Sequence, residues 1–185
     1  MKFFFLFFIL IFNISFAAQA SIKKEIINNF KKIKNISFNF KQTIGEKTEI
    51  GNCIIEYPKK IYCKYDNFKK KIIVSNGKSL VIKNRAINQY FRYPLNKTPL
   101  NILLNKDYII KEMEKIDGKV VNEKYYNFLL KQSENEINIF FDINSYDLIG
   151  WQTEDIYQNL VVTYIYNIEK NNVIKKKYFQ LPPLN

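Results

Sequence analysis

Short apolar stretches that alternate with polar residues recur along most of this chain, and they constrain its fold more than any other feature. In residues 35–43, Ile36, Phe38 and Phe40 alternate with Ser, Asn and Lys side chains. Successive side chains of a strand point to opposite faces of a sheet, so this stretch is typical of a strand with one apolar and one solvated face. A chain with many such strands must bury the apolar faces against one another or beneath a helix.

Turn signals separate these stretches and predict a series of hairpins. One turn is expected at Tyr57-Pro58, and another at Asn76-Gly77, as a type I′ turn that needs positive φ at both central residues. The other expected strands cover residues 107–115, 124–132, 135–144, 145–155 and 160–168, and the end of the chain at 175–185. The series amounts to about nine or ten short antiparallel strands, a pattern typical of a barrel or a curved sheet.

Residues 21–35 have a different spacing, since Ile22, Ile26, Phe30 and Ile33 recur with Lys and Asn between them. Apolar residues three or four positions apart lie on one face of a helix, so this segment predicts one amphipathic helix. It precedes all of the expected strands. A curled sheet has a concave apolar face that is filled by side chains, by a ligand or by a helix, and this segment is one of two helices that the chain offers as a cover.

A short apolar segment at residues 96–106 interrupts the strands. Thr98 is expected to cap a helix there with Pro99 at its first position, so that Leu100, Leu103 and Leu104 share one face. Isolated helices below ~12–15 residues are marginal in water, so we expect this one to pack as a lid on the sheet. A sheet of this size must curl. The predicted fold is therefore mainly β (α+β), a half-open antiparallel β-barrel or strongly curved sheet with an N-terminal helix and a short helical lid.

The first twenty residues have the pattern of a secretory signal peptide. Lys2 is followed by an apolar run from Phe3 to Phe12, and Ala18-Gln19-Ala20 has the small-x-small pattern of a cleavage site. The alternative is an uncleaved anchor, but the run is short for a membrane span of ~20 residues. We expect residues 1–20 to be removed and residues 21–185 to form a single exported domain.

The composition argues against catalysis and metal binding. The chain contains no His and only two Cys, which removes Ser-His-Asp and Cys-His nucleophiles and His-containing zinc sites. Glu134 with Glu136, or Glu154 with Asp155, could pair, but neighbouring acids on a loop are usually solvated. We expect no catalytic residue, no metal, no cofactor and no enzymatic activity.

The formal net charge is +12, from 29 Lys and Arg against 17 Asp and Glu. A basic protein can bind nucleic acid or an anionic membrane. Here the lysines are scattered and no nucleic-acid motif accompanies them, so we expect no nucleic-acid partner.

The order of several segments points to one known family. The segments are "IKNISFNFKQT" with its Phe-x-Phe-x-Gln core, "GNCIIEYPKKIYCKY" with Pro at its tip, "IIVSNGKSLVIKN", "NKTPLNILL", "DLIGWQTEDIYQN" and "KYFQLPP". In this series the chain resembles the outer-membrane lipoprotein carrier proteins, LolA-type, of Gram-negative bacteria, over nearly all of the mature sequence.

The resemblance implies a monomeric periplasmic carrier that shields lipoprotein acyl chains. Its partners would be an inner-membrane lipoprotein-releasing ABC transporter and an outer-membrane lipoprotein receptor. Two alternatives share the fold: a carrier of another lipid, such as a glycolipid, and a receptor-type lipoprotein. The receptor would need a Cys directly after the signal peptide, where this chain has Ser21.

Two departures from the family pattern bear on function. Members commonly have an Arg before the hairpin Pro that bonds to the lid, and this chain has Tyr57 there. A Tyr hydroxyl offers one donor where a guanidinium offers five, so we expect a weaker latch or another residue in its place. The sequence also ends shortly after Pro182-Pro183, where better-known members continue further.

The residues expected to contact acyl chains come from the lid and from the inner faces of strands. The lid contributes Leu100, Leu103 and Leu104. The strands contribute Ile36, Phe38, Phe40, Ile61, Tyr65, Ile137, Ile139 and Phe141. Ordinary core packing explains any one of the strand residues equally well, and a bulge would reverse a strand's faces.

Cys53 and Cys63 flank the turn at Tyr57-Pro58. An odd-numbered loop centred on Pro58 would place them opposite each other, and the periplasm favours disulfides. With an even-numbered loop they would be two separate buried thiols.

Overall fold

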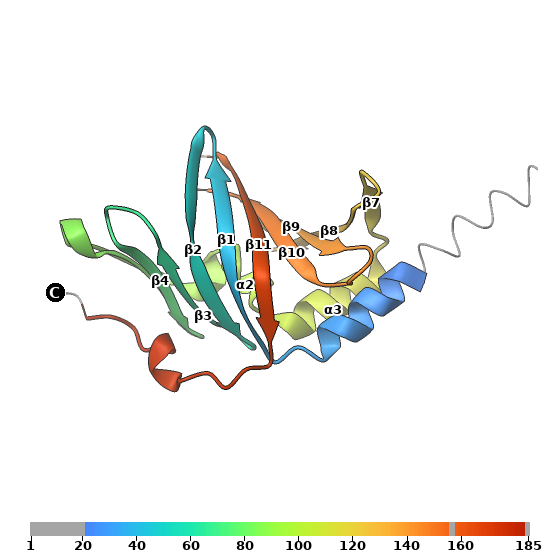
Figure 1. Ribbon diagram of the computed structural model, residues 1–185, viewed down its shortest axis with the longest axis horizontal. Coiled ribbons are helices and arrows are strands. Elements are labelled where there is room, and N and C mark those ends of the chain that lie inside the picture. The colour runs from blue at the N-terminus through green and yellow to red at the C-terminus, as the bar shows by residue number, and fades with distance from the viewer. Residues whose placement is uncertain (1–20, 156–157, 184–185) are drawn as a thin grey trace, which may run out of the picture.

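The computed structural model describes residues 21–155 and 158–183, and within them eleven strands form one antiparallel sheet (Figure 1). The order across the sheet is β6-β5-β4-β3-β2-β1-β11-β10-β9-β8-β7. The strands are β1 Asn35–Ile44, β2 Lys47–Glu56, β3 Lys60–Tyr65, β4 Lys71–Asn76, β5 Ser79–Asn84, β6 Gln89–Pro94, β7 Lys119–Val121, β8 Tyr125–Gln132, β9 Asn135–Asp142, β10 Leu148–Glu154 and β11 Leu160–Lys170.

The first and last strands of the chain lie side by side in the middle of the sheet. Strand β1 pairs with β2 on one side and with β11 on the other, with Phe40 opposite Gly51 and Ile165. From β1 the chain therefore runs out to one edge at β6 and returns from the other edge at β7. This arrangement is a curved, half-open antiparallel sheet, and it confirms the predicted fold class.

A helical segment carries the chain from one edge of the sheet to the other. It consists of the 3-10 turn η2 (Leu95–Lys97), α2 (Leu100–Leu103) and α3 (Lys106–Lys115). The expected cap is wrong: the Thr98 hydroxyl donates to the carbonyl of Leu95 at 2.8 Å and does not cap α2.

The strand expected over residues 107–115 is also wrong, because these residues form α3. Ile109, Ile110 and Met113 are buried at helical spacing, and Asn105 caps the helix by accepting from the Tyr108 N–H at 3.3 Å. An apolar pair followed by an apolar residue three positions later fits a helix face, and the alternation that suggested a strand was coincidental.

The predicted N-terminal helix is present over residues 21–31 and lies beside α3 under the sheet (Figure 1). The Lys23 ammonium donates to the carbonyl of Ile116 at 2.7 Å, which ties the two helices together. Ile26, Phe30 and Ile33 are at most 3% exposed and pack with the inner face of the sheet. This contact forms the main hydrophobic core.

Both predicted hairpin turns occur, but one has a different centre. Strands β4 and β5 are joined by Gly77 and Lys78, and only Gly77 of this turn has positive φ, at 98°. A glycine at the first central position is the type II′ arrangement, so the predicted type I′ turn centred on Asn76-Gly77 is wrong. Asn76 instead ends β4, and its side chain accepts from the N–H groups of Lys78 and Ser79, each at 3.0 Å.

The C-terminal segment covers the outer face of β3 and β4. Residues 175–183 do not add the expected strand; they contain the 3-10 turn η3 (Lys176–Phe179). The ring of Tyr178 lies 5.2 Å from that of Tyr62, and the Lys83 ammonium donates to the carbonyl of Pro183 at 2.7 Å. Ile72, Val74 and Val81 are buried on this face, outside the main core, and with Phe179 we call them the outer layer.

The predicted signal peptide, residues 1–20, lies outside the described residues. The extent of the single domain, residues 21–185, stays a prediction. Among the residues described, none of the helices has the length and apolar character needed to cross a membrane.

Candidate functional site

An apolar cavity of about 310 Å³ opens on the inner face of the sheet, under the start of α2. Its walls come from β1 to β5, β10 and β11, and Pro99 and Leu100 of the helical segment lie over it. The lining side chains are Phe40, Gln42, Cys53, Ile61, Cys63, Tyr65, Lys71, Ile73, Ile82, Pro99, Leu100, Trp151, Thr153, Glu154, Asp155, Val161 and Thr163. A largely apolar cavity with a few polar groups at its margin is the usual form of a lipid or small-molecule site.

Aromatic side chains define the floor of the cavity. The ring of Phe40 lies 4.8 Å from that of Tyr65, and Trp151 packs edge-on against Phe38 at 6.1 Å. Gly51 lies between Phe40 and Tyr65 in the sheet register. A Cβ at this position would lie 2.2 Å from the carbonyl oxygen of Lys64 and 2.9 Å from the Phe40 ring, so only glycine fits between the neighbouring strand and the aromatic ring.

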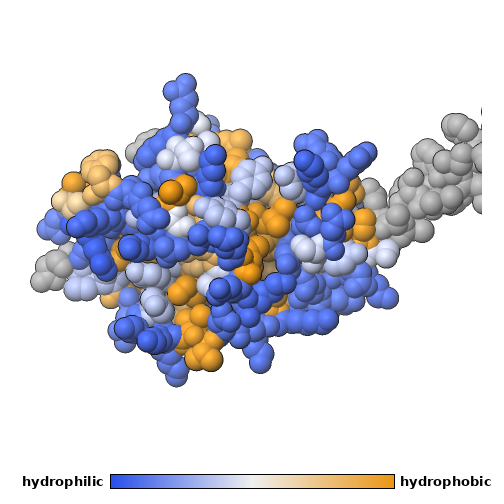
Figure 2. All heavy atoms as spheres, in the orientation of Figure 1, coloured by the Kyte–Doolittle hydropathy of each residue, from blue (hydrophilic) through white to orange (hydrophobic). Residues whose placement is uncertain are grey.

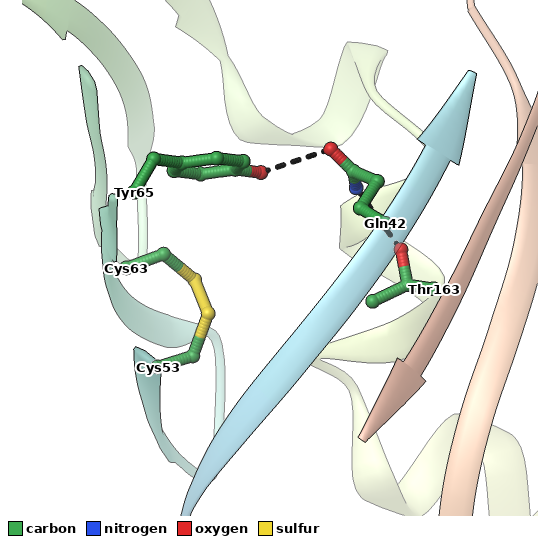
Figure 3. Close-up of a disulfide and its surroundings, with 5 residues drawn as sticks. All are labelled: Gln42, Cys53, Cys63, Tyr65 and Thr163. Carbon is green, nitrogen blue, oxygen red and sulfur yellow. Dashed lines mark hydrogen bonds between the residues drawn. A yellow bond between two sulfur atoms is a disulfide. The ribbon is translucent and has the colours of Figure 1, made fainter. Parts of the chain in front are cut away.

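One end of the cavity is polar. Figure 3 shows Tyr65, Gln42 and Thr163 in a chain that joins β3, β1 and β11. The Tyr65 hydroxyl donates to Gln42 Oε1 at 3.1 Å, and Gln42 Nε2 donates to Thr163 Oγ1 at 3.0 Å. Burial, assisted by the nearby charge of Glu49, raises the pKa of Tyr65 and keeps the hydroxyl neutral as a donor. These bonds satisfy polar groups that would otherwise be buried beside apolar walls.

An ion pair of Lys71 with Glu49 lies beside this polar end. The Lys71 ammonium pairs with Glu49 and lies 3.7 Å from the centre of the Tyr65 ring, and Lys47 approaches the other carboxylate oxygen at 3.0 Å. Burial alone would raise the pKa of Glu49, but hydrogen bonds and charge from Lys71 and Lys47 outweigh it and lower that pKa. Burial lowers the pKa of Lys71, and Glu49 only partly opposes this. At this wall of the cavity the Lys71 ammonium is therefore paired with a carboxylate.

A disulfide joins Cys53 and Cys63 in the cavity wall (Figure 3). The hairpin between β2 and β3 has an odd-numbered loop, residues 57–59, and the two cysteines are direct cross-strand partners with Cα atoms 4.1 Å apart. The bond fixes the register between β2 and β3, and β3 carries Ile61 and Tyr65. Both cysteines line the cavity.

The structure divides the three lid leucines. Leu100 lines the cavity and is half-buried, whereas Leu103 and Leu104 are fully buried in the main core. The carbonyl of Leu104 accepts from the backbone N–H of Lys59 at 2.8 Å, so the end of α2 is attached to the tip of the β2–β3 hairpin. Of these residues, Pro99 and Leu100 at the start of α2 cover the cavity.

The residue at the position of the family's Arg does not hold the lid. Within the described part of the chain, the Tyr57 hydroxyl is buried without a hydrogen-bond partner, and burial raises its pKa. Its ring packs edge-on against Phe30 at 5.7 Å. A hydrogen bond nearby is made by Lys106. Its ammonium donates to the carbonyl of Ile33 at 2.7 Å, and this joins α3 to the end of the N-terminal helix.

The predicted strand residues separate into two groups. Phe40, Ile61 and Tyr65 line the cavity. The others lie in the core beneath the helices, each at most 2% exposed: Ile36, Phe38, Ile137, Ile139 and Phe141. Whether any of them contacts a ligand stays a prediction.

The sequence reasoning did not include several residues of the cavity. Gln42, Trp151, Thr153, Val161 and Thr163 continue the inward parity of β1, β10 and β11 toward the polar end. The two-residue period of these strands is the signal that marks them. No local signal marks Ile73 and Ile82, because their neighbours Ile72 and Val81 are equally apolar.

Comparison with known families decides the relationship. The model of the family "Outer membrane lipoprotein carrier protein LolA" matches residues 31–182. The chain belongs to the LolA family. This confirms the resemblance derived from the hairpins, the lid and the terminal Pro-Pro. A comparison with curated protein sequences finds no match.

Solved structures with a similar fold have little sequence in common with this LolA family member. A conserved uncharacterized protein from Thermus thermophilus matches with a TM-score of 0.51 and 7% identity, over 88% of this chain and 94% of that chain. A LolA superfamily protein from Nitrosomonas europaea matches with a TM-score of 0.43 and 7% identity, over 85% and 97%. MucB matches with a TM-score of 0.48 and 7% identity, over 90% and 63%. The first likeness shows a shared fold.

Proposed function

We propose that this LolA family member is a periplasmic carrier of lipoprotein acyl chains, which it takes from an inner-membrane releasing transporter and passes to an outer-membrane receptor. The observation that carries the proposal is the apolar cavity under Pro99 and Leu100, in a chain that belongs to the LolA family. The predicted signal peptide supports export to the periplasm.

The energetics of acyl chains explain why a carrier of this form is needed. Each buried methylene contributes ~0.8 kcal/mol, so one chain of ~16 carbons represents on the order of 12 kcal/mol that is unfavourable in water. The cavity walls supply apolar contact through Ile61, Ile73, Ile82 and Trp151. Such contact is non-directional, and it can therefore accept chains of different length without a specific recognition group.

Release requires that the cover of the cavity can move. Leu100 contributes an apolar side chain to the cavity but is half-buried, while the following residues of α2 are fixed in the core. A short segment that ends at a fixed point can open at its start, and such lids commonly control ligand entry and exit. We infer that opening occurs at Pro99 and Leu100, with Leu103 and Leu104 as the fixed end.

The first test is the identity of the molecules that purify with the protein from the native periplasm, measured by mass spectrometry. Acylated lipoproteins are expected. Free lipids or glycolipids in their place would favour the alternative of another lipid carrier. A protein that carries no acylated molecule, and takes none up from a lipoprotein-loaded transporter in vitro, would contradict the proposal.

The second test is Leu100→Glu, with Leu129→Glu as the matched control. Leu129 is 42% exposed on the outer face of β8, away from the cavity. A carboxylate at position 100 can reach solvent in the empty protein, so both variants should fold. Acyl chains would then meet a charge at the cavity cover, and lipoprotein uptake by Leu100→Glu should fall at least about tenfold, since burial of a charge costs several kcal/mol. Equal uptake by the two variants would show that Leu100 does not contact the chains.

A further inference from the structure

A row of apolar side chains crosses the inner face of strands β1 to β6 and becomes more exposed toward the edge. The sheet register places these cross-strand partners in one line: Phe38, Cys53, Cys63, Ile73, Ile82 and Phe91. The first three are at most 4% exposed, Ile73 and Ile82 are half-buried, and Phe91 on the edge strand β6 is 44% exposed. We call this line the apolar row.

The apolar row continues beyond the cavity. Ile73 and Ile82 line the cavity, and Phe91 is the next partner of Ile82 across the sheet. A polar row formed by Lys71, Asn84 and Gln89 borders it on one side. Single exposed apolar residues are normal on protein surfaces, but one that extends a ligand cavity is typical of a binding groove.

The outer face of the same strands is not open to a ligand. There the outer layer is already covered by residues 175–183, so Ile72 and Val81 are at most 3% exposed. On the inner face of β4 to β6, apolar side chains of equal size stay partly exposed. The curved sheet therefore presents its open apolar surface on the side of the cavity.

We propose that the apolar row is a second part of the acyl-binding surface, along which a long chain extends from the cavity at Ile82 as far as Phe91. The inference rests on the proposed function. The cavity has about 310 Å³, at the lower end of the ~300–1,000 Å³ of typical ligand sites. Cys63 and Phe91 are three strand spacings of about 4.8 Å apart, so the row adds apolar length that the cavity lacks.

The single tryptophan, Trp151, lines the cavity and allows the two parts of the surface to be probed separately. The probe is a synthetic cysteinyl lipopeptide whose two sixteen-carbon chains carry bromine at their methyl ends, because bromine quenches tryptophan on contact. Three proteins with one tryptophan each are compared: the natural chain, Trp151→Phe with Phe91→Trp, and Trp151→Phe with Tyr166→Trp. Tyr166 is the matched control, since it is 44% exposed like Phe91 but lies on the outer face of β11. Melting curves check that all three fold.

The expected result is loss of most emission at positions 151 and 91, with emission at position 166 unchanged. The same lipopeptide with eight-carbon chains should quench position 151 and spare position 91. Quenching at 151 alone by the long chains would overturn the inference and leave the proposed function intact. No quenching at 151 or 91 would contradict the proposed function itself. Quenching at 166 as well would mean unspecific adsorption and would also overturn the inference.

The energetic contribution of the row is tested with Phe91→Asn, and Phe68→Asn is the control. Phe68 is 80% exposed in the loop between β3 and β4 and is not part of the row. Titration followed by Trp151 emission should show about tenfold weaker binding of the long-chain lipopeptide to Phe91→Asn, because the variant removes apolar surface from the row, and no change for short chains. An equal effect on both lengths, or none, would overturn the inference. So would a dimer in sedimentation that Phe91→Asn dissociates, because the edge would then be covered by a second copy.

Discussion

The two halves of the sheet differ in which face buries their apolar residues most completely. In β8 and β9 the inner face is buried beneath the N-terminal helix and α3, with Phe128, Ile139 and Phe141 at most 1% exposed. In β4 and β5 the best-buried apolar residues, Val74 and Val81, lie on the outer face, beneath the C-terminal segment. Figure 1 shows the two covers at opposite ends of the sheet, the helices near β8 and the terminal segment near β3 and β4.

This difference explains how a half-open sheet can be stable and still have an open apolar surface. A strand needs one buried face, and it does not matter to its stability which one is covered. In the β4–β5 half the outer layer supplies that burial, so the inner face can stay available to a ligand. The face of the molecule drawn in Figure 2 is mostly hydrophilic, with separate hydrophobic patches.

The largest effect is expected from Leu103→Glu, in the covered part of the helical segment. Leu103 is fully buried in the main core, and an unpaired buried charge costs several kcal/mol, comparable with a domain stability of ~5–15 kcal/mol. The variant should be largely unfolded by circular dichroism, while Leu100→Glu melts near the natural protein. A well-folded Leu103→Glu would mean that the whole of α2 can swing away from the sheet.

The next effect is expected at the outer layer, from Phe179→Ala. Phe179 is 5% exposed, and truncation of a buried Phe costs about 3 kcal/mol or more. Urea unfolding should show this loss. Surface substitutions usually change stability by no more than about 0.5 kcal/mol, and a value that small would show that the C-terminal segment does not stabilise the β4–β5 half.

Reduction of the disulfide should destabilise the protein by about 2–3 kcal/mol, because the bond closes a loop of about ten residues and restricts the unfolded chain. Urea unfolding with and without reductant measures the difference. The double variant Cys53→Ser with Cys63→Ser is the control, since it should not respond to reductant. An unchanged midpoint for the natural protein would contradict a closed disulfide in the cavity wall.

The smallest effect is expected from acid, through Glu49. The pKa of Glu49 is lowered in the folded protein, so its contribution to stability is present above the ordinary carboxyl range and is lost as the pH falls through the lowered pKa. The lowered pKa of Lys71 offsets part of this gain at neutral pH. Urea midpoints at several pH values below neutrality should fall less steeply for Glu49→Gln than for the natural protein. Identical slopes would show that the pair does not contribute.

Local sequence patterns were enough to predict most of the strands and which side chains share a face, but the edge strands β6 and β7 were not predicted. The period of two at Ile36, Phe38 and Phe40 is a local property of extended chain, and all three point inward as predicted. The N-terminal helix followed from its spacing in the same way. The helix over residues 107–115 was missed, because a short apolar pair such as Ile109-Ile110 fits either structure until its packing partner is known.

Tertiary packing was needed to establish which face is covered and where the cavity lies. Ile72 and Ile73 are adjacent and identical, yet Ile72 is buried in the outer layer and Ile73 faces the cavity. Likewise Leu100 covers the cavity, while Leu103, three residues later on the same helix face, is core. The alternation along a strand decides which face of the sheet a side chain points to. Whether that side chain is buried depends on which distant segment packs on that face. Here those segments are α3 and the C-terminal residues, and no local pattern specifies their positions.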